Sequence, residues 1–344
     1  GAAKLVAMCL WFWAGTSKLN PHFGYVVMNM TANHPLAPCW LRRMMFKTFP
    51  TDLRPSLLAQ VSAHSAVVAE MIVPTFLTFG PGTGPLHALG VVIMVALHVH
   101  ILLNVPVGNP TEWQMAMFYN VYFYFYTRPE VAVATHLNPA IVFAVISAVI
   151  VPFVGQIRPD LVSFLMAMRY YAGNWCWSCV VFTGGYEGYL KMQKLQTVSD
   201  VDLKKAFAAS GFSPAVALNL MNIGPVFLSV HLPYRGLQTL IPKHVPSSKL
   251  EGAFCILGDM VGQYALGYNF GDGHLIDEYL ISNVAERCEF APGEVLMFRI
   301  EGAPLFGSTH TYTVIDAHGG KVIDTGKLHL KDLLQMQPWN VKAQ

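Results

Sequence analysis

A lysine, an asparagine and a histidine stand close together in residues 15–23, "GTSKLNPHF", directly after the aromatic run "CLWFW". A lysine whose pKa is lowered at a membrane boundary can abstract a proton as a general base. Lys18 and His22 are therefore candidate catalytic residues. Alternatively, Lys18 extends its ammonium group from a membrane helix to the aqueous border, and the Asn20-Pro21 pair ends that helix. Of these two interpretations, we favour the border.

Two further ionisable residues, His64 and Glu70, lie inside the apolar segment 57–79. Ionisable groups are costly inside a bilayer, so they indicate function by default. Their six-residue spacing puts the two side chains on different faces of a helix, so a joint site needs a further helix. The alternative is that each side chain is hydrogen-bonded to a neighbouring helix. If the protein is an enzyme, we expect its catalytic residues to be Lys18, His22, His64 and Glu70.

Three histidines, His87, His98 and His100, occupy the next apolar segment, 86–105. His87 and His98 are eleven residues apart, which returns to the same helix face about 16 Å further along the axis. They are too far apart to share one metal ion. Each alone is a candidate ligand for a haem iron or a chlorophyll magnesium. The alternative, which we favour, is a histidine hydrogen-bonded to a neighbouring helix.

An aromatic stripe follows in segment 113–126: with Glu112 just before the segment, Tyr119, Tyr122 and Tyr126 fall on one helix face. Such a stripe is typical of a membrane aromatic belt or of a contact face for another subunit. A quinone or pigment pocket is the sharper alternative, and it makes Tyr119 a candidate cofactor-binding residue.

Two other groups of residues are typical of redox or metal chemistry. Cys176 and Cys179 form a C-x-x-C pair, which can be a redox dithiol or half of a zinc site. Asp272, His274 and Glu278 in "GDGHLIDEYL" have side chains that can bind a metal. We favour free cysteines in an apolar segment and a glycine-rich turn with Asp272 as a helix cap. We therefore assign no metal site.

The composition indicates that membrane helices position these side chains. The 344 residues are 53% hydrophobic and 12% charged, with a mean hydropathy of +0.42. Soluble domains have about 25% charged residues, so the apolar excess must face lipid. The net charge of +2 argues against nucleic acid as a partner. Six scattered cysteines are too few for a secreted disulfide scaffold.

The predicted fold is an all-α integral membrane bundle of about six membrane segments with a small C-terminal α+β soluble domain. The candidate segments are 4–16, 57–79, 86–105, 113–126, 139–154 and 161–182. Arg169 inside the last segment needs a partner, for which Glu70 is a candidate. We expect a transmembrane domain at 1–183, an amphipathic or interfacial connection at 184–241 and an α+β tail at 242–344. In that tail, 294–300 and 311–315 are predicted strands, and a turn at "DAHGGK" leads to a third.

Two resemblances to known families follow from these motifs. "FWAGTSKLNPHF" and the histidine-bearing spans after it resemble the horizontally transferred transmembrane domain of vitamin K-dependent γ-carboxylases. That resemblance implies a lysine base in a membrane cavity, with Lys18 as the candidate. The tail "FGDGHLIDEYLISNVAERCEFAPGEVLMFRIEGAP" and the terminal "QPW" resemble an uncharacterised family of polytopic bacterial transmembrane proteins. Together with the abrupt start at Gly1, this second resemblance leads us to expect a longer parent protein.

Two functions are compatible with these observations. The first is a non-catalytic accessory subunit of a larger membrane assembly, such as a photosynthetic or respiratory complex with bound chlorophyll, haem or lipid. The second is a membrane enzyme that acts on a lipid or lipid-soluble substrate. A transporter is a third, weaker possibility. In each case we expect a multi-pass protein whose partners are membrane lipids and, for the subunit, other membrane chains. An enzyme should gather its ionisable groups around a cavity, whereas a subunit should scatter them.

Overall fold

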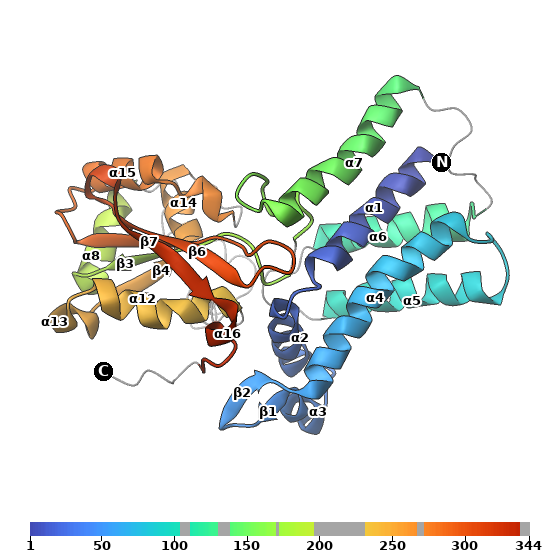
Figure 1. The fold of residues 1–344 in the computed structure, drawn as a ribbon, viewed down its shortest axis with the longest axis horizontal. Coiled ribbons are helices and arrows are strands. Elements are labelled where there is room, and N and C mark those ends of the chain that lie inside the picture. Colours follow the sequence, from blue (N-terminus) through green and yellow to red (C-terminus); the bar gives the residue numbers. More distant parts are fainter. Residues whose placement is uncertain (104–110, 130–137, 170–171, 196–230, 267–271, 338–344) are drawn as a thin grey trace, which may run out of the picture. The chain divides into compact units, whose positions relative to one another are not determined.

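The computed structural model describes residues 1–103, 111–129, 138–169, 172–195, 231–266 and 272–337. The chain divides into two compact units. The helical unit comprises residues 1–174 and 304–306, and the sheet unit comprises residues 175–303 and 307–344. Figure 1 shows the elements of each unit.

The helical unit is built from helices joined by short connections. Its described helices are α1 Ala2–Ser17, α2 His22–Asn33, α3 Cys39–Met44, α4 Leu57–Phe79, α5 Pro85–Leu103, α6 Thr111–Asn120 and α7 Pro139–Ile157. A π-helical turn, η1 Val121–Tyr126, continues α6, and a hairpin of β1 Phe46–Thr48 and β2 Asp52–Pro55 precedes α4. Helix α1 packs against α4 and α7, while α5 packs against α4 and α6 (Figure 1).

Local sequence signals explain where these helices begin and end. Helix α1 ends just before the Asn20-Pro21 pair, and α2 begins immediately after it. The Ser56 hydroxyl accepts a hydrogen bond from the N–H of Ala59 and thereby caps α4. The Asn138 side chain caps α7 in the same way. These caps satisfy backbone donors that have no partner within the helix.

Three helices of the described chain, α4, α5 and α7, are long and apolar enough to cross a membrane. The prediction of about six membrane segments is therefore not confirmed. Helix α1 has 16 residues, and α6 and η1 have 10 and 6, so these helices are shorter than the roughly 20 residues that a span needs. In segment 161–182 the described residues form turns and then a β-strand, not a membrane helix.

Helix α4 has one face buried inside the unit and an opposite face that is exposed. Ala59, Ala63, Val67 and Glu70 recur at helical spacing and are buried. Three apolar residues on the other side are more than half exposed in the chain: Val61, Val68 and Ile72. A membrane span presents such an apolar outer face to lipid, so the pattern agrees with a membrane helix.

The sheet unit contains one five-stranded antiparallel sheet in the described residues. Its strands are, in spatial order, β4 Phe254–Leu257, β3 Trp177–Phe182, β5 Val295–Ile300, β6 Thr309–Asp316 and β7 Lys321–His329. Helices α14 Gly258–Leu266 and α15 Glu278–Arg287 lie over one face, and α12 Leu237–His244 lies over the other (Figure 1). The core on the α14 and α15 side includes buried residues of both layers, among them Val180, Met297, Ile281 and Val284.

The predicted strands at 294–300 and 311–315 and the third strand after "DAHGGK" are confirmed as β5, β6 and β7. The sheet also includes β3, whose six residues are all buried. A strand covered on both faces is a continuous apolar run, and periodicity alone does not distinguish it from a membrane segment. This is why segment 161–182 was interpreted as a span, and why the compact sheet unit begins at residue 175. Much of the connection expected at 184–241 lies outside the described residues.

Candidate functional site

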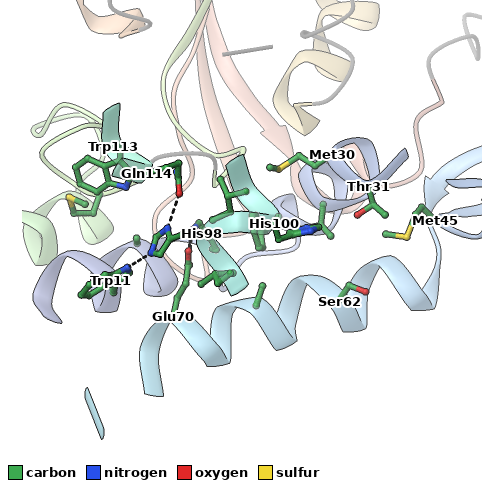
Figure 2. Close-up of a pocket in the computed structure, with 18 of the residues that line it drawn as sticks. Trp11, Met30, Thr31, Met45, Ser62, Glu70, His98, His100, Trp113 and Gln114 are labelled. Atoms are coloured by element: carbon green, nitrogen blue, oxygen red, sulfur yellow. Dashed lines mark hydrogen bonds and ion pairs between the residues drawn. The ribbon is translucent and has the colours of Figure 1, made fainter. Parts of the chain in front are cut away.

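The helical unit encloses a cavity of about 320 Å³ between α1, α2, α4, α5 and α6. Its walls are mainly apolar, and a few polar side chains converge on it. The polar and ionisable residues in its lining are Lys18, Thr31, Ser62, Glu70, His98, His100 and Gln114 (Figure 2). Ligand cavities have volumes of about 300–1,000 Å³ and this same mixture of apolar wall and few polar groups. The cavity is therefore large enough for a small molecule or part of a lipid.

Lys18 and Glu70 form an ion pair in the wall of this cavity. The Lys18 Nζ lies 2.6 Å from each carboxylate oxygen of Glu70, and the two residues are only 7% and 5% exposed. Lys18 follows the last residue of α1, where the helix dipole favours a cation. The Lys18 ammonium group is thus paired inside the described chain, while α1 ends before the Asn20-Pro21 pair, as the border interpretation expects. Arg169, the partner that we considered for Glu70, is buried directly after the turn at 164–168.

Close packing of α1 on α4 brings the pair together. A Cβ atom on Gly15 would lie 2.6 Å from Cγ of Met71 and 3.3 Å from the carbonyl oxygen of Val67. Only a glycine permits this approach without a shift of the neighbouring atoms. Gly15 is one turn before Lys18, so the contact fixes the position from which the lysine reaches Glu70 on α4. The ring of Phe23 also faces the ammonium group, with its centroid 5.4 Å from Nζ.

His98, also in the lining of the cavity, is held between two side chains (Figure 2). The indole N–H of Trp11 donates to Nε2 of His98 at 2.8 Å. Nε2 is thus an acceptor, so Nδ1 carries the proton and donates to Oε1 of Gln114 at 2.7 Å. With these two hydrogen bonds, the His98 side chain is a neutral imidazole with its proton on Nδ1. A metal or haem iron at His98 would have to displace the Trp11 hydrogen bond.

The other predicted residues have different surroundings. His100 lines the cavity and stacks on His34, with ring centroids 5.3 Å apart. His22 is buried but is not part of the lining, and His64 is exposed on the outer side of α4, as its spacing from Glu70 predicted. The structure therefore brings Lys18 and Glu70 together and separates His22 and His64 from the cavity.

The remaining cofactor candidates lie away from the cavity lining. His87 is buried, and its Nε2–H donates to the carbonyl of Phe125 at 2.6 Å. His87 and His98 are both buried, in agreement with the shared helix face predicted from their spacing. Tyr119 is 56% exposed, and its ring contacts the tilted ring of Phe123 with a centroid distance of 4.3 Å.

Sequence reasoning missed Trp11 and Gln114. Both hydrogen-bond to the His98 ring and fix its position, and both are buried in the cavity lining. Gln114 carried a signal, because an amide in an apolar aromatic segment needs a hydrogen-bond partner. Trp11 carried none, since its indole was one of several aromatic groups in the run "CLWFW".

In the sheet unit, the C-x-x-C pair does not act as one group. Cys179 shares a thiol hydrogen bond with Cys255 on β4, whereas Cys176 lies against the ring of His274. Burial raises the pKa of the Cys176 thiol to about 12. Burial alone lowers the pKa of His274, but hydrogen bonds with Asp272, Cys176 and Glu301 outweigh it and raise that pKa to about 12.

The metal set considered from the sequence is changed by the fold. Glu278 pairs with Arg299, at 3.3 Å, and not with His274. Glu301, which is 27 residues from His274, takes its place at 2.7 Å. Asp272 does cap the short helix after it, because its carboxylate accepts the N–H of His274. The antiparallel sheet, and not local spacing, supplies the acidic partner.

These features define an integral membrane protein with a polar site in an apolar cavity. Residues 1–344 match the model of the family described as "transmembrane protein of unknown function (DUF3556)", and the chain belongs to that family. The match supports the resemblance to an uncharacterised transmembrane family and gives no link to the γ-carboxylase-like module. None of the curated proteins and none of the solved structures compared with the chain matches it.

Proposed function

We propose that the helical unit is a membrane enzyme that binds a lipid-soluble substrate in its cavity and exchanges a proton with it through Lys18 and Glu70. The observation that supports this proposal is the convergence of the buried ion pair and the His98 network on one apolar cavity. Among the candidates named from the sequence, His22, His64, His87 and Tyr119 lie outside the cavity lining, which is the scattered pattern expected of a non-catalytic subunit.

The chemistry follows from the low polarity of the site. The Lys18 Nζ lies 2.6 Å from each Glu70 oxygen, so in this proposal Lys18 passes one proton to Glu70 when the substrate enters. Neutral Lys18 then takes a proton from the substrate, and the resulting ammonium group is paired with the substrate anion and lies beside Glu70. The Trp11–His98–Gln114 network provides an oriented polar surface in the same cavity lining.

Ligand capture and turnover test this proposal together. The full chain is purified in mild detergent, and its bound lipids are identified by mass spectrometry. It is then incubated with a lipid extract of the source membrane, and the products are compared with those of Lys18→Met and Glu70→Gln. We expect a bound lipid-soluble molecule that is converted by the native chain and by His64→Ala, the matched exterior control, but not by the two pair variants. Conversion that survives Lys18→Met overturns the proposal.

An accessory role in a larger assembly is a second proposal, favoured by one observation. Tyr119, Tyr122 and Tyr126 on α6 and η1 are 56%, 53% and 66% exposed, and they form an aromatic surface suited to another membrane chain. The cofactors of such an assembly would be pigment or haem, with His87, His98 or His100 as ligands. A coloured complex with co-purifying chains in the same detergent preparation supports this role. A colourless, solitary chain contradicts it.

A further inference from the structure

Four potential metal-binding side chains from three separate stretches of the sequence meet in the sheet unit. Cys176 immediately precedes β3 and Glu301 immediately follows β5. Because Trp177 on β3 pairs with Ile300 on β5, these two residues lie at the same end of the antiparallel pair. Asp272 and His274 approach this end from the short 3-10 helix η4, Gly273–Leu275.

The side chains point at one another. One ligand atom from each of Cys176, His274 and Glu301 lies within 4.8 Å of the other two. His274 Nε2 is 2.7 Å from Oε2 of Glu301, and its Nδ1 is 2.9 Å from Oδ1 of Asp272. His274 thus faces a carboxylate with each ring nitrogen.

The backbone also fits the cluster closely. The N–H of Gly302 donates to Oε1 of Glu301 at 2.8 Å, which leaves Oε2 directed at His274. A Cβ atom on Gly273 would lie 2.7 Å from the carbonyl oxygen of Cys176 and 2.9 Å from its Sγ. The glycine therefore allows η4 to approach the thiol closely enough to bring in His274.

We propose that Cys176 Sγ, His274 Nε2 and Glu301 Oε2 bind a zinc ion, with Asp272 as the partner that orients His274. Thiolate, imidazole and carboxylate are the ligands zinc takes, and three protein ligands leave one tetrahedral position for water or a substrate. A carboxylate on the second ring nitrogen is the usual support of a zinc-bound histidine. Asp272 has this position.

The distances suit tetrahedral coordination after a small adjustment. Zinc bonds of about 2.0–2.3 Å place neighbouring ligand atoms about 3.3–3.7 Å apart. The His274–Glu301 contact at 2.7 Å must open by less than 1 Å, and a separation at the upper bound of 4.8 Å must close by little more than that. Cys176 is 2% exposed, which suits a thiolate that holds an ion better than a nucleophile that attacks a substrate.

Metal analysis of the full chain in detergent tests this site. We expect one zinc per chain after purification in zinc-containing buffer. After removal of the zinc, we expect cobalt(II) to give a sulfur-to-cobalt charge-transfer band and tetrahedral visible bands. Asp272→Asn should weaken the affinity for cobalt about 10- to 100-fold. Cys176→Ser should remove the charge-transfer band.

Matched controls separate this site from the alternatives. Cys179→Ser removes the other thiol of the C-x-x-C pair. Glu278→Gln removes a carboxylate that lies near His274 in the sequence but pairs with Arg299 in the structure. Both should retain stoichiometric zinc and the cobalt spectrum. If the native, folded chain binds no zinc and shows no charge-transfer band with cobalt, the cluster is a hydrogen-bonded network only and the proposal is overturned. A spectrum that depends on Cys179 and not on Cys176 overturns it as well.

Discussion

Removing one member of the Lys18–Glu70 pair should destabilise the chain far more than removing both. At the observed 2.6 Å contact, the attraction between the charges is about 6 kcal/mol with an effective dielectric constant near 20. Burial opposes this attraction, so the net value of the pair is small. A single deletion nevertheless leaves an uncompensated buried charge, which costs about 3–5 kcal/mol. We therefore expect Lys18→Met and Glu70→Leu each to lower the free energy of unfolding by about that amount.

The double variant distinguishes this account from simple loss of packing. Because a buried ion pair can be replaced by apolar groups of similar volume at little cost, Lys18→Met with Glu70→Leu should recover most of the lost stability. The assay is denaturant or thermal unfolding of the full chain in detergent, analysed as a double-mutant cycle. Additive single effects would refute the reasoning.

A second ion pair in the helical unit provides the matched control. Arg158 and Asp160 lie 2.6 Å apart, as Lys18 and Glu70 do, but their side chains are 58% and 43% exposed. Solvent screens this pair and hydrates either charge when it is left alone. Arg158→Met should therefore leave the unfolding midpoint unchanged in the same assay.

Three further predictions address other contacts. Gly15→Ala should lower the unfolding midpoint and reduce retention of bound lipid, because its methyl group would separate α1 from α4; Gly252→Ala, whose added Cβ meets no atom within 4 Å, should do neither. Trp11→Phe removes the 2.8 Å hydrogen bond to His98 and should cost about 1–3 kcal/mol of stability in denaturant unfolding. Burial, and then the charge of Asp272, raise the pKa of Asp259 from 3.8 to about 6. The folded state therefore holds more protons between these values, so stability should fall by up to about 3 kcal/mol as the pH rises through this window. Asp259→Asn should abolish that dependence in unfolding measured from pH 4 to 7.

Part of the candidate site was predictable from residue types. Lys18 and Glu70 were identified because ionisable groups in apolar segments require a partner. Their pairing was not predictable, since Arg169 was an equally suitable cation and nothing local places α1 beside α4. The close approach of α1 to α4 at Gly15 is what places Lys18 beside Glu70.

The composition and local signals of the sequence determined the membrane character, the helices that begin at Leu57 and Pro139, and the strands β5, β6 and β7. These features depend on residues close together in the chain. Only the tertiary structure decided that 177–182 is a central strand, since an apolar run is equally compatible with lipid and with a sheet covered on both faces. It also decided that Glu301 and not Glu278 meets His274, because strand pairing joins residues whose distance in the sequence carries no local signal.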